Sequence, residues 1–232
     1  MGGVHPLKRN FPFPGRIVLA VPAIYLFCGS QAFAGDPPAP YSETVAVLSS
    51  VFEGEVRARI GYDACASQAV REGYPNIAYL FSSLSASEAI HAANFRKILS
   101  ALGAEVTEPS PEDIVTKKTR ENLKTACDRE LEEIDRKYPT LLERMRPEGH
   151  EETVRFLTYA WQSEKQHRDL LKSIQSGTGF FFGTLTRRIE GTPMAFLVCT
   201  NCGSTVGERP KDRCPICAGP PSGYEELEKT RP

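Results

Sequence analysis

Glu88-Ala89-Ile90-His91 and its later counterpart Glu164-Lys165-Gln166-His167 decide how this sequence folds. Each stretch lies within a long run of apolar residues at helical spacing. Residues three apart project from one face of an α-helix, so each stretch offers a carboxylate and an imidazole to the same point. Carboxylates and imidazoles are ligands of transition metals. We therefore expect a metal site between two helices.

Two further glutamates fit the same site. Glu55 precedes the glutamate of the first stretch by almost the same interval as Glu130 precedes that of the second. A helix-breaking run falls midway in each interval, at Gly73-Tyr74-Pro75 and at Pro147-Glu148-Gly149. Residues equidistant from the turn of a helical hairpin lie at the same height. Two single glutamates and two Glu-x-x-His pairs on four helices form the ligand pattern of ferritin-like di-iron bundles.

The bundle reads as two copies of one helical hairpin. A single shift along the sequence carries Glu72-Gly73 onto Glu148-Gly149 and the first Glu-x-x-His stretch onto the second. Under the same shift, Glu55 lands next to Glu130. Such a duplication gives the pseudo-symmetric ligands that two adjacent metal ions require.

The predicted fold is mainly α, a ferritin-like four-helix bundle over residues 41–175. We expect the helices to begin at Ser42, Pro75, Thr119 and Glu151, with a kink of the third at Tyr138-Pro139. The long connection from Gly103 to Lys118 can cross the bundle at about 3.3 Å per residue. Taken alone, Glu55 and the acidic run around Glu130 also fit solvated helix faces. Their spacing from the Glu-x-x-His stretches favours the metal site.

Residues 1–34 read as a signal peptide. Three basic residues precede the apolar run Ile17–Cys28, and Ala32-Phe33-Ala34 is a small-x-small cleavage site. The apolar run is shorter than the roughly 20 residues of a membrane-spanning helix. We expect cleavage after Ala34 and export to the periplasm. The alternatives are an uncleaved membrane anchor and a misassigned start.

Composition and charge fit a soluble globular protein. Hydrophobic residues make up 41% of the chain and charged residues 25%. Removing the leader's three basic residues from the 28 in the chain leaves 25 against 29 acidic residues, a net charge of −4. We therefore expect no nucleic-acid binding, and no membrane association once the signal is cleaved.

A small second domain is predicted at residues 196–230, after a connector at 176–195. Cys199-Thr200-Asn201-Cys202 and Cys214-Pro215-Ile216-Cys217 are two Cys-x-x-Cys knuckles separated by eleven residues. Four thiolates so spaced make a rubredoxin-like tetrahedral site for iron or zinc, which spacing does not distinguish. Two disulfides are the alternative in an exported protein. The other two cysteines of the mature chain, Cys65 and Cys127, are predicted to be separate buried thiols.

With these residues in place, the chain resembles rubrerythrin over roughly residues 41–227. The resemblance is carried by Phe52–Arg59, Glu88–His91, Glu121–Lys124 with Glu130 and Glu133, Glu164–His167 and the two cysteine knuckles. It implies a site for two iron ions, ligated by Glu55, Glu88, His91, Glu130, Glu133, Glu164 and His167. It also implies one iron, or zinc, held by Cys199, Cys202, Cys214 and Cys217.

The resemblance also implies roles for individual residues. Glu133 matches an additional glutamate of the family that exchanges with a histidine, here His91, when the site is reduced. Tyr62 and Tyr138 fall where family members carry tyrosines beside the ligands, and such tyrosines orient carboxylates and donate protons.

The implied activity is reduction of hydrogen peroxide to water, with electrons relayed through the four-cysteine iron from an unidentified donor protein. Family members work as dimers that place the cysteine knuckles of one subunit beside the di-iron site of the other, so we expect a homodimer. The connector, which contains Phe180-Phe181-Phe182, departs from the family pattern. The alternatives are a ferroxidase or iron-handling protein, and a non-catalytic redox sensor with zinc in the four-cysteine site.

Overall fold

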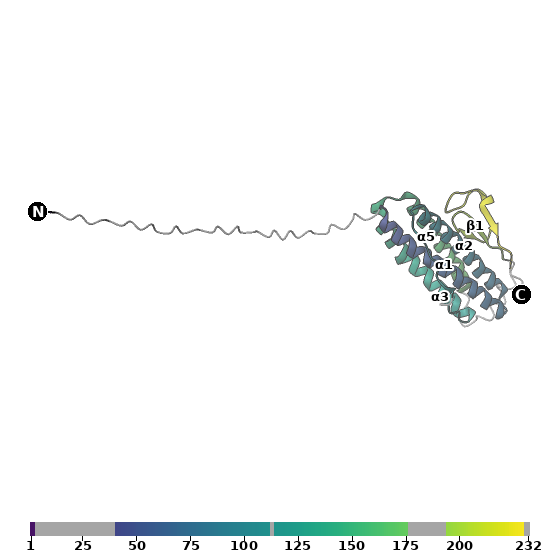
Figure 1. The fold of residues 1–232 in the computed structure, drawn as a ribbon. Coiled ribbons are helices and arrows are strands. Elements are labelled where there is room, and N and C mark those ends of the chain that lie inside the picture. The colour runs from purple at the N-terminus through teal and green to yellow at the C-terminus, as the bar shows by residue number, and fades with distance from the viewer. Residues whose placement is uncertain (3–39, 112–113, 176–193, 230–232) are drawn as a thin grey trace. The chain divides into compact units, whose positions relative to one another are not determined.

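The helices follow the apolar spacing of the sequence. In the computed structural model they are α1 (Ser42–Arg71), α2 (Pro75–Ala101), α3 (Thr119–Glu132), α4 (Tyr138–Met145) and α5 (Glu151–Gln175). α4 continues α3 after one π-helical turn, so the two together form the third of the four predicted helices. The predicted four-helix bundle is confirmed, and the small C-terminal domain with β1 lies beside it (Figure 1).

The structure describes residues 1–2, 40–111, 114–175 and 194–229. The predicted signal peptide lies outside the described residues except for its first two. The same holds for Phe180–Phe182 and most of the predicted connector. Residues Pro38–Pro232 form one compact unit. Within the described ranges, no helix is long and apolar enough to cross a membrane.

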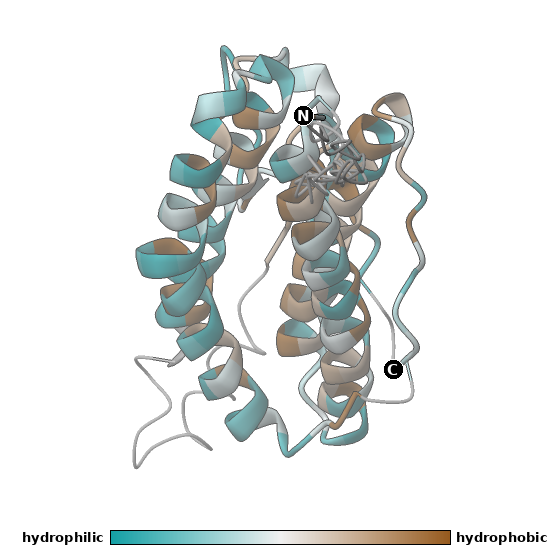
Figure 2. Cartoon of the chain, turned by 60° about the vertical axis from the view of Figure 1, so that its left-hand side comes forward, coloured by the Kyte–Doolittle hydropathy of each residue, from teal (hydrophilic) through white to brown (hydrophobic). Residues whose placement is uncertain are grey.

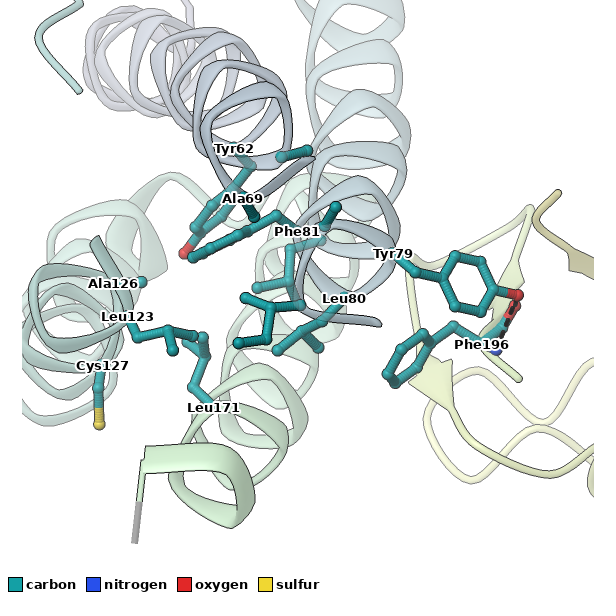
Figure 3. Close-up of a cluster of buried hydrophobic side chains, with 14 of the residues drawn as sticks. Tyr62, Ala69, Tyr79, Leu80, Phe81, Leu123, Ala126, Cys127, Leu171 and Phe196 are labelled. Atoms are coloured by element: carbon teal, nitrogen blue, oxygen red, sulfur yellow. Dashed lines mark hydrogen bonds between the residues drawn. The ribbon is translucent and has the colours of Figure 1, made fainter. Parts of the chain in front are cut away.

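Two apolar clusters fill the bundle and leave a polar layer between them. One cluster includes Tyr62, Phe81 and Leu171 (Figure 3), and the other includes Phe52 and Phe95. Apolar and polar residues alternate along the helices in the manner of amphipathic segments (Figure 2). On each helix the change from one cluster to the other occurs where the predicted ligands lie. The ligands are therefore enclosed by apolar packing on both sides.

The third helix changes geometry just before Pro139. The Tyr138 N–H bonds the Glu133 carbonyl five residues earlier, which makes a π-helical turn over Glu133–Lys137. The Tyr138 N–H is thus not available to the Ile134 carbonyl, and the next residue, Pro139, has no N–H to donate. The Ile134 carbonyl therefore lacks a donor from its own helix. The indole N–H of Trp161 donates to that carbonyl instead, at 3.0 Å. The kink predicted at Tyr138-Pro139 falls where the π-helical turn over Glu133–Lys137 meets α4.

The repeated Glu-Gly pairs cap helices across the bundle. The Glu148 carboxylate accepts the backbone N–H groups of Glu43 and Thr44 at 2.9 and 2.7 Å, in the first turn of α1. The Glu72 carboxylate accepts the N–H of Thr119, the first residue of α3, at 3.2 Å. Free N–H groups and the positive end of the helix dipole favour a carboxylate at both places. Each hairpin turn therefore caps a helix of the other hairpin.

The C-terminal domain is a small antiparallel sheet of β1 (Leu197–Cys199), β2 (Thr205–Val206) and β3 (Tyr224–Glu226), in the order β2-β1-β3. It packs on the bundle through Phe196, whose ring lies 5.0 Å from that of Tyr79 on α2 (Figure 3). The Tyr79 hydroxyl accepts the Phe196 N–H and donates to the Leu227 carbonyl. The Tyr79 side chain thus binds both Phe196, directly before the first strand of the domain, and Leu227, directly after the last strand.

Candidate metal centres

Six of the seven predicted di-iron ligands converge in the polar layer of the bundle. Their ligand atoms fall into two groups, and within each group all lie within 4.8 Å of one another. The first group is Glu55, Glu88, His91 and Glu164, and the second is Glu88, Glu130, Glu164 and His167. All six side chains are at most 2% exposed. Glu88 and Glu164 belong to both groups, which is the arrangement needed for carboxylates that bridge two ions.

The two Glu-x-x-His pairs have the same geometry in both halves of the bundle. In each pair the histidine Nδ1 lies 2.9 Å from its own glutamate, His91 from Glu88 and His167 from Glu164. Each Nδ1 also faces the shared glutamate of the other half, that of His91 at 3.5 Å from Glu164 and that of His167 at 3.4 Å from Glu88. Nδ1 is therefore the ligand atom of both rings, and Nε2 points away from the carboxylates.

Tyr62 and Tyr138 contact the two carboxylates that belong to one group each. The Tyr138 hydroxyl donates to Glu55 at 2.6 Å, and the Tyr62 hydroxyl donates to Glu130. Burial, followed by the charges of the neighbouring glutamates, raises the pKa of both phenols. The two tyrosines therefore remain protonated donors at neutral pH.

The electrostatics of the site fit two cations. Burial, and then the nearby Glu164, raise the pKa of Glu130; burial, and then Glu88, raise that of Glu164. Glu130 Oε2 is buried and has no hydrogen-bond partner. Four buried carboxylates around two imidazoles need positive charge, and an unpartnered carboxylate oxygen needs a donor or a metal. The six residues thus form a carboxylate and histidine site with the donors that two iron ions require.

Glu133, the seventh predicted ligand, belongs to neither group. Its carboxylate lies 3.0 Å from Lys137 Nζ, within the same π-helical turn. The Glu133 side chain is 14% exposed and that of Lys137 is 29% exposed, so the pair is mostly enclosed. The structure therefore has His91 among the ligand atoms and Glu133 paired with a lysine.

The four-cysteine site is formed as predicted. Cys199, Cys202, Cys214 and Cys217 have Sγ atoms within 4.8 Å of one another, with 3.7 Å between Cys199 and Cys217 and 3.5 Å between Cys202 and Cys214. A tetrahedral ion with metal–sulfur bonds of about 2.3 Å has sulfur–sulfur edges of about 3.8 Å. A hydrogen bond from the Cys202 thiol, assisted by backbone N–H groups, lowers the pKa of Cys199 to about 5. The set fits one iron or zinc ion.

The six cysteines of the described residues are all free thiols, and the alternative of two disulfides among the knuckles does not occur. Cys127 is buried as predicted, whereas Cys65 is only half-buried. The prediction for Cys65 was wrong because its place on α1 lies at the edge of the apolar cluster, which it contacts without entering.

The two candidate sites meet within one chain, whereas the family resemblance implies that the knuckle of one subunit lies beside the di-iron site of the other. The Cys202 carbonyl lies 3.2 Å from His91 Nε2, the ring nitrogen that faces away from the carboxylates. The Asn94 side chain donates to the Asn201 carbonyl at 2.9 Å. Both contacts join residues more than 100 positions apart, and no periodicity in the sequence reports such a contact. One knuckle therefore lies against the histidine face of the bundle.

A family model and individual relatives both match this chain to rubrerythrins. The rubrerythrin family model matches residues 46–175. Rubrerythrin of Porphyromonas gingivalis is 31% identical over 191 residues, covering 80% of this chain and 90% of the relative. Rubrerythrin-2 of Clostridium acetobutylicum is 29% identical over 174 residues, covering 75% of this chain and 91% of the relative.

Solved structures share the fold at lower identity. Fully reduced nigerythrin superposes with a TM-score of 0.68 at 22% identity, covering 92% of this chain and all of nigerythrin. A Desulfovibrio desulfuricans bacterioferritin gives a TM-score of 0.62 at 23% identity, covering 69% of this chain and 94% of the bacterioferritin. The nigerythrin match therefore covers more of this chain than the bacterioferritin match.

Proposed function

This chain belongs to the rubrerythrin family, and we propose that it is a non-haem di-iron peroxidase that reduces hydrogen peroxide to water. Reduction of one peroxide molecule consumes two electrons and two protons and yields two water molecules. Iron in the carboxylate and histidine site would supply the electrons, and iron in the four-cysteine site would replace them one at a time.

The contact between the two candidate sites is the observation that most favours this proposal. Cys202 belongs to the four-cysteine site and His91 to the carboxylate and histidine site, and one hydrogen bond of 3.2 Å joins them. A knuckle that served only to hold the fold would not need to lie on a ligand of the other site. An electron relay uses this proximity, whereas iron storage and zinc sensing do not.

Side chains at the site can hold the protons that the reaction consumes. The hydroxyls of Tyr62 and Tyr138 keep Glu130 and Glu55 in place from outside the ligand groups. Burial raises the pKa of Glu133 in spite of the nearby Lys137 charge, so its carboxyl keeps a proton more readily than an ordinary glutamate. We propose that Glu133, once protonated and released from Lys137, is the acid that protonates the departing oxygen.

A stoichiometric titration tests the proposal. The iron-loaded protein is reduced chemically without air and mixed with measured amounts of hydrogen peroxide, while ferric–thiolate absorbance is followed. We expect one peroxide consumed per two electrons, and no consumption by Glu130→Ala, which lacks a ligand. Oxidation by dioxygen in preference to peroxide would support the ferroxidase alternative. A colourless four-cysteine site filled with zinc would support the sensor alternative.

We also propose that the mature protein begins after Ala34, is exported, works as a homodimer and receives electrons from a separate donor protein. The basis is the charged and apolar pattern of the leader and the family assignment. The mass of the protein isolated from its native host tests export, because retention of Met1 would contradict it. Sedimentation of the metal-loaded protein tests the dimer, which a monomeric mass would exclude.

A further inference from the structure

Two serines occupy equivalent positions beside Glu88 and Glu164, the glutamates that both ligand groups share. Ser87 directly precedes Glu88, and Ser163 directly precedes Glu164. Their separation in the sequence is the interval of the internal repeat, and their hydroxyl oxygens lie 3.3 Å apart. Both side chains are fully buried, and each directly precedes a glutamate that belongs to both ligand groups. A buried hydroxyl is costly unless it is hydrogen-bonded, so the partners of these two hydroxyls define their role.

Both hydroxyls donate to one backbone carbonyl of the C-terminal domain. Ser87 Oγ lies 2.6 Å from the Gly203 carbonyl oxygen, and Ser163 Oγ lies 3.0 Å from it. Thr205 Oγ1 of the same domain donates to that oxygen at 3.0 Å. A carbonyl oxygen has two lone pairs, so these three donors saturate it. The carbonyl next to the Cys202 knuckle is therefore held from both halves of the bundle at once.

The same hydroxyls also face a site histidine. His167 Nε2 lies 3.0 Å from Ser87 Oγ and 3.3 Å from Ser163 Oγ. When Nδ1 of a histidine binds a metal, its Nε2 carries the proton and donates. Each serine can accept that hydrogen bond because its own hydrogen points to the Gly203 carbonyl. His91 donates directly to Cys202, whereas His167 reaches Gly203 through the serines.

Gly203 permits this close approach because it has no side chain. A Cβ atom at this position would overlap His91 Nε2 and would lie 2.6 Å from Ser87 Oγ. The residue also has φ +78°, a left-handed conformation that favours glycine. The backbone at Cys202-Gly203 thus rests directly on the histidines and serines of the bundle.

We propose that Ser87 and Ser163 are paired positioning residues that dock the Cys202-Gly203 peptide onto the two histidines. They fix the distance between the four-cysteine site and the carboxylate and histidine site, and they orient the Nε2 atom of His167. Alanine at either position would fill nearly the same space, so packing alone does not explain a hydroxyl in both halves. The use of this docking for electron delivery rests on the proposed function, whereas the docking itself does not.

Hydrogen exchange in the metal-loaded full-length protein tests the docking. The Thr205 N–H crosses the interface to Gln166 Oε1 at 3.1 Å, so its exchange reports separation of the domain from the bundle. We expect Ser87→Ala and Ser163→Ala each to speed exchange in residues 202–206 about five- to tenfold, as expected for one lost hydrogen bond. The double variant should be faster still.

Ser83→Ala is the matched control. Ser83 is also fully buried on α2, but its hydroxyl donates within the helix, to the Leu80 carbonyl at 2.7 Å. We expect its exchange in residues 202–206 to equal that of the wild type. If the double variant does not fold, the single variants still decide the question. Exchange in both single variants equal to that of Ser83→Ala would overturn the proposal.

A second measurement separates this proposal from the proposed function. Stopped-flow absorbance follows oxidation of a prereduced four-cysteine iron after peroxide is added, and we expect it to slow in the serine variants. If the wild type does not consume peroxide, the proposed function fails, while the exchange data still test the docking. If the wild type consumes peroxide and exchange is unchanged in the variants, only the docking proposal fails.

Discussion

The Glu133 carboxylate forms an ion pair with Lys137, at 3.0 Å, inside the π-helical turn that precedes Pro139. The pair is enclosed by Gly54 of α1, where an added Cβ would lie 3.1 Å from Lys137 Nζ, and by the Tyr138 ring, 5.9 Å from the same atom. The Glu133 carboxylate, which would have to leave this pair to join the nearby ligand groups, is thus held by a cation of its own helix.

We predict that this ion pair is stronger than an exposed pair of the same spacing. A double-mutant cycle with Glu133→Gln and Lys137→Met should give a coupling of about 1–2 kcal/mol in urea unfolding, because removing one partner leaves a mostly buried charge. The control is Glu132 with Arg136, also four residues apart but 66% and 76% exposed. That cycle should give at most about 0.5 kcal/mol. Equal coupling energies in the two cycles would show that the ion pair with Lys137 is no stronger than an exposed pair.

The tyrosine hydroxyls should matter for metal affinity. We predict that Tyr138→Phe and Tyr62→Phe each weaken Fe(II) binding about tenfold, since each removes the hydrogen bond that orients a ligand carboxylate. A competition titration against a chromophoric chelator without oxidants measures this. Tyr79→Phe is the control, because its hydroxyl bonds the backbone of Phe196 and Leu227 and not a ligand carboxylate. Unchanged affinity in the first two variants would contradict the prediction.

The cap made by Glu72 should contribute to stability in a pH-dependent way. Burial opposes ionisation, but hydrogen bonds from Gln68 and Thr119 outweigh it and lower the pKa of Glu72. A lowered folded-state pKa gives stability that is present above the ordinary glutamate pKa of about 4.3 and is lost as pH falls through the folded value. We predict that Glu72→Ala costs about 1 kcal/mol at pH 7.

Thermal and urea unfolding at pH 7 and in the acid range measure this difference. The gap between the wild type and Glu72→Ala should narrow as pH falls below about 4.3. Glu53→Ala, an exposed position on α1, serves as the control and should change stability by less than about 0.5 kcal/mol. A gap that is constant with pH would exclude the carboxylate as the cause.

Cys65 should react slowly with alkylating reagents. Burial raises its pKa from 9.0 to about 11, in spite of the nearby Arg129 charge. The thiolate is the reactive form, so at pH 8 the reactive fraction falls about 100-fold below that of an ordinary thiol. Iodoacetamide labelling of metal-loaded protein, read by peptide mass, should show Cys65 labelled slowly until the protein is unfolded in urea. Rapid labelling of folded protein at pH 8, or a peptide in which Cys65 is linked to Cys127, would contradict this.

The sequence was sufficient to predict the bundle and six converging ligand-type residues, because hairpin geometry and helical spacing are local properties. The position of Glu133 was harder to predict, because a π-helical turn changes the direction of side chains. This turn depends on Pro139, which has no N–H, and on Trp161, which donates to the carbonyl of Ile134. The internal repeat relates other residues of the site as well as the ligand-type residues. Tyr62 and Tyr138 are separated by the same repeat interval, and so are Ser87 and Ser163.

The docking of the C-terminal domain was not predictable by the same means. It depends on the backbone carbonyls of Cys202 and Gly203. Every residue has a backbone carbonyl, so the residue types at these positions do not indicate the contact. The serine before each Glu-x-x-His glutamate was the available signal. The role of this serine could be assigned only once its partner, the Gly203 carbonyl oxygen, was known, and Gly203 lies far from Ser87 in the sequence.

Trp161 gives this protein an intrinsic optical reporter. It is the only tryptophan of the chain, and its indole N–H bonds the carbonyl of Ile134, the residue directly after Glu133. Lys165 Nζ lies 3.8 Å from the centre of its ring, so a cation sits on the face of the chromophore. Any rearrangement of the turn that carries Glu133 alters the surroundings of this single emitter. Ordinary fluorescence, with no added label, would therefore report a change in the structure of that turn.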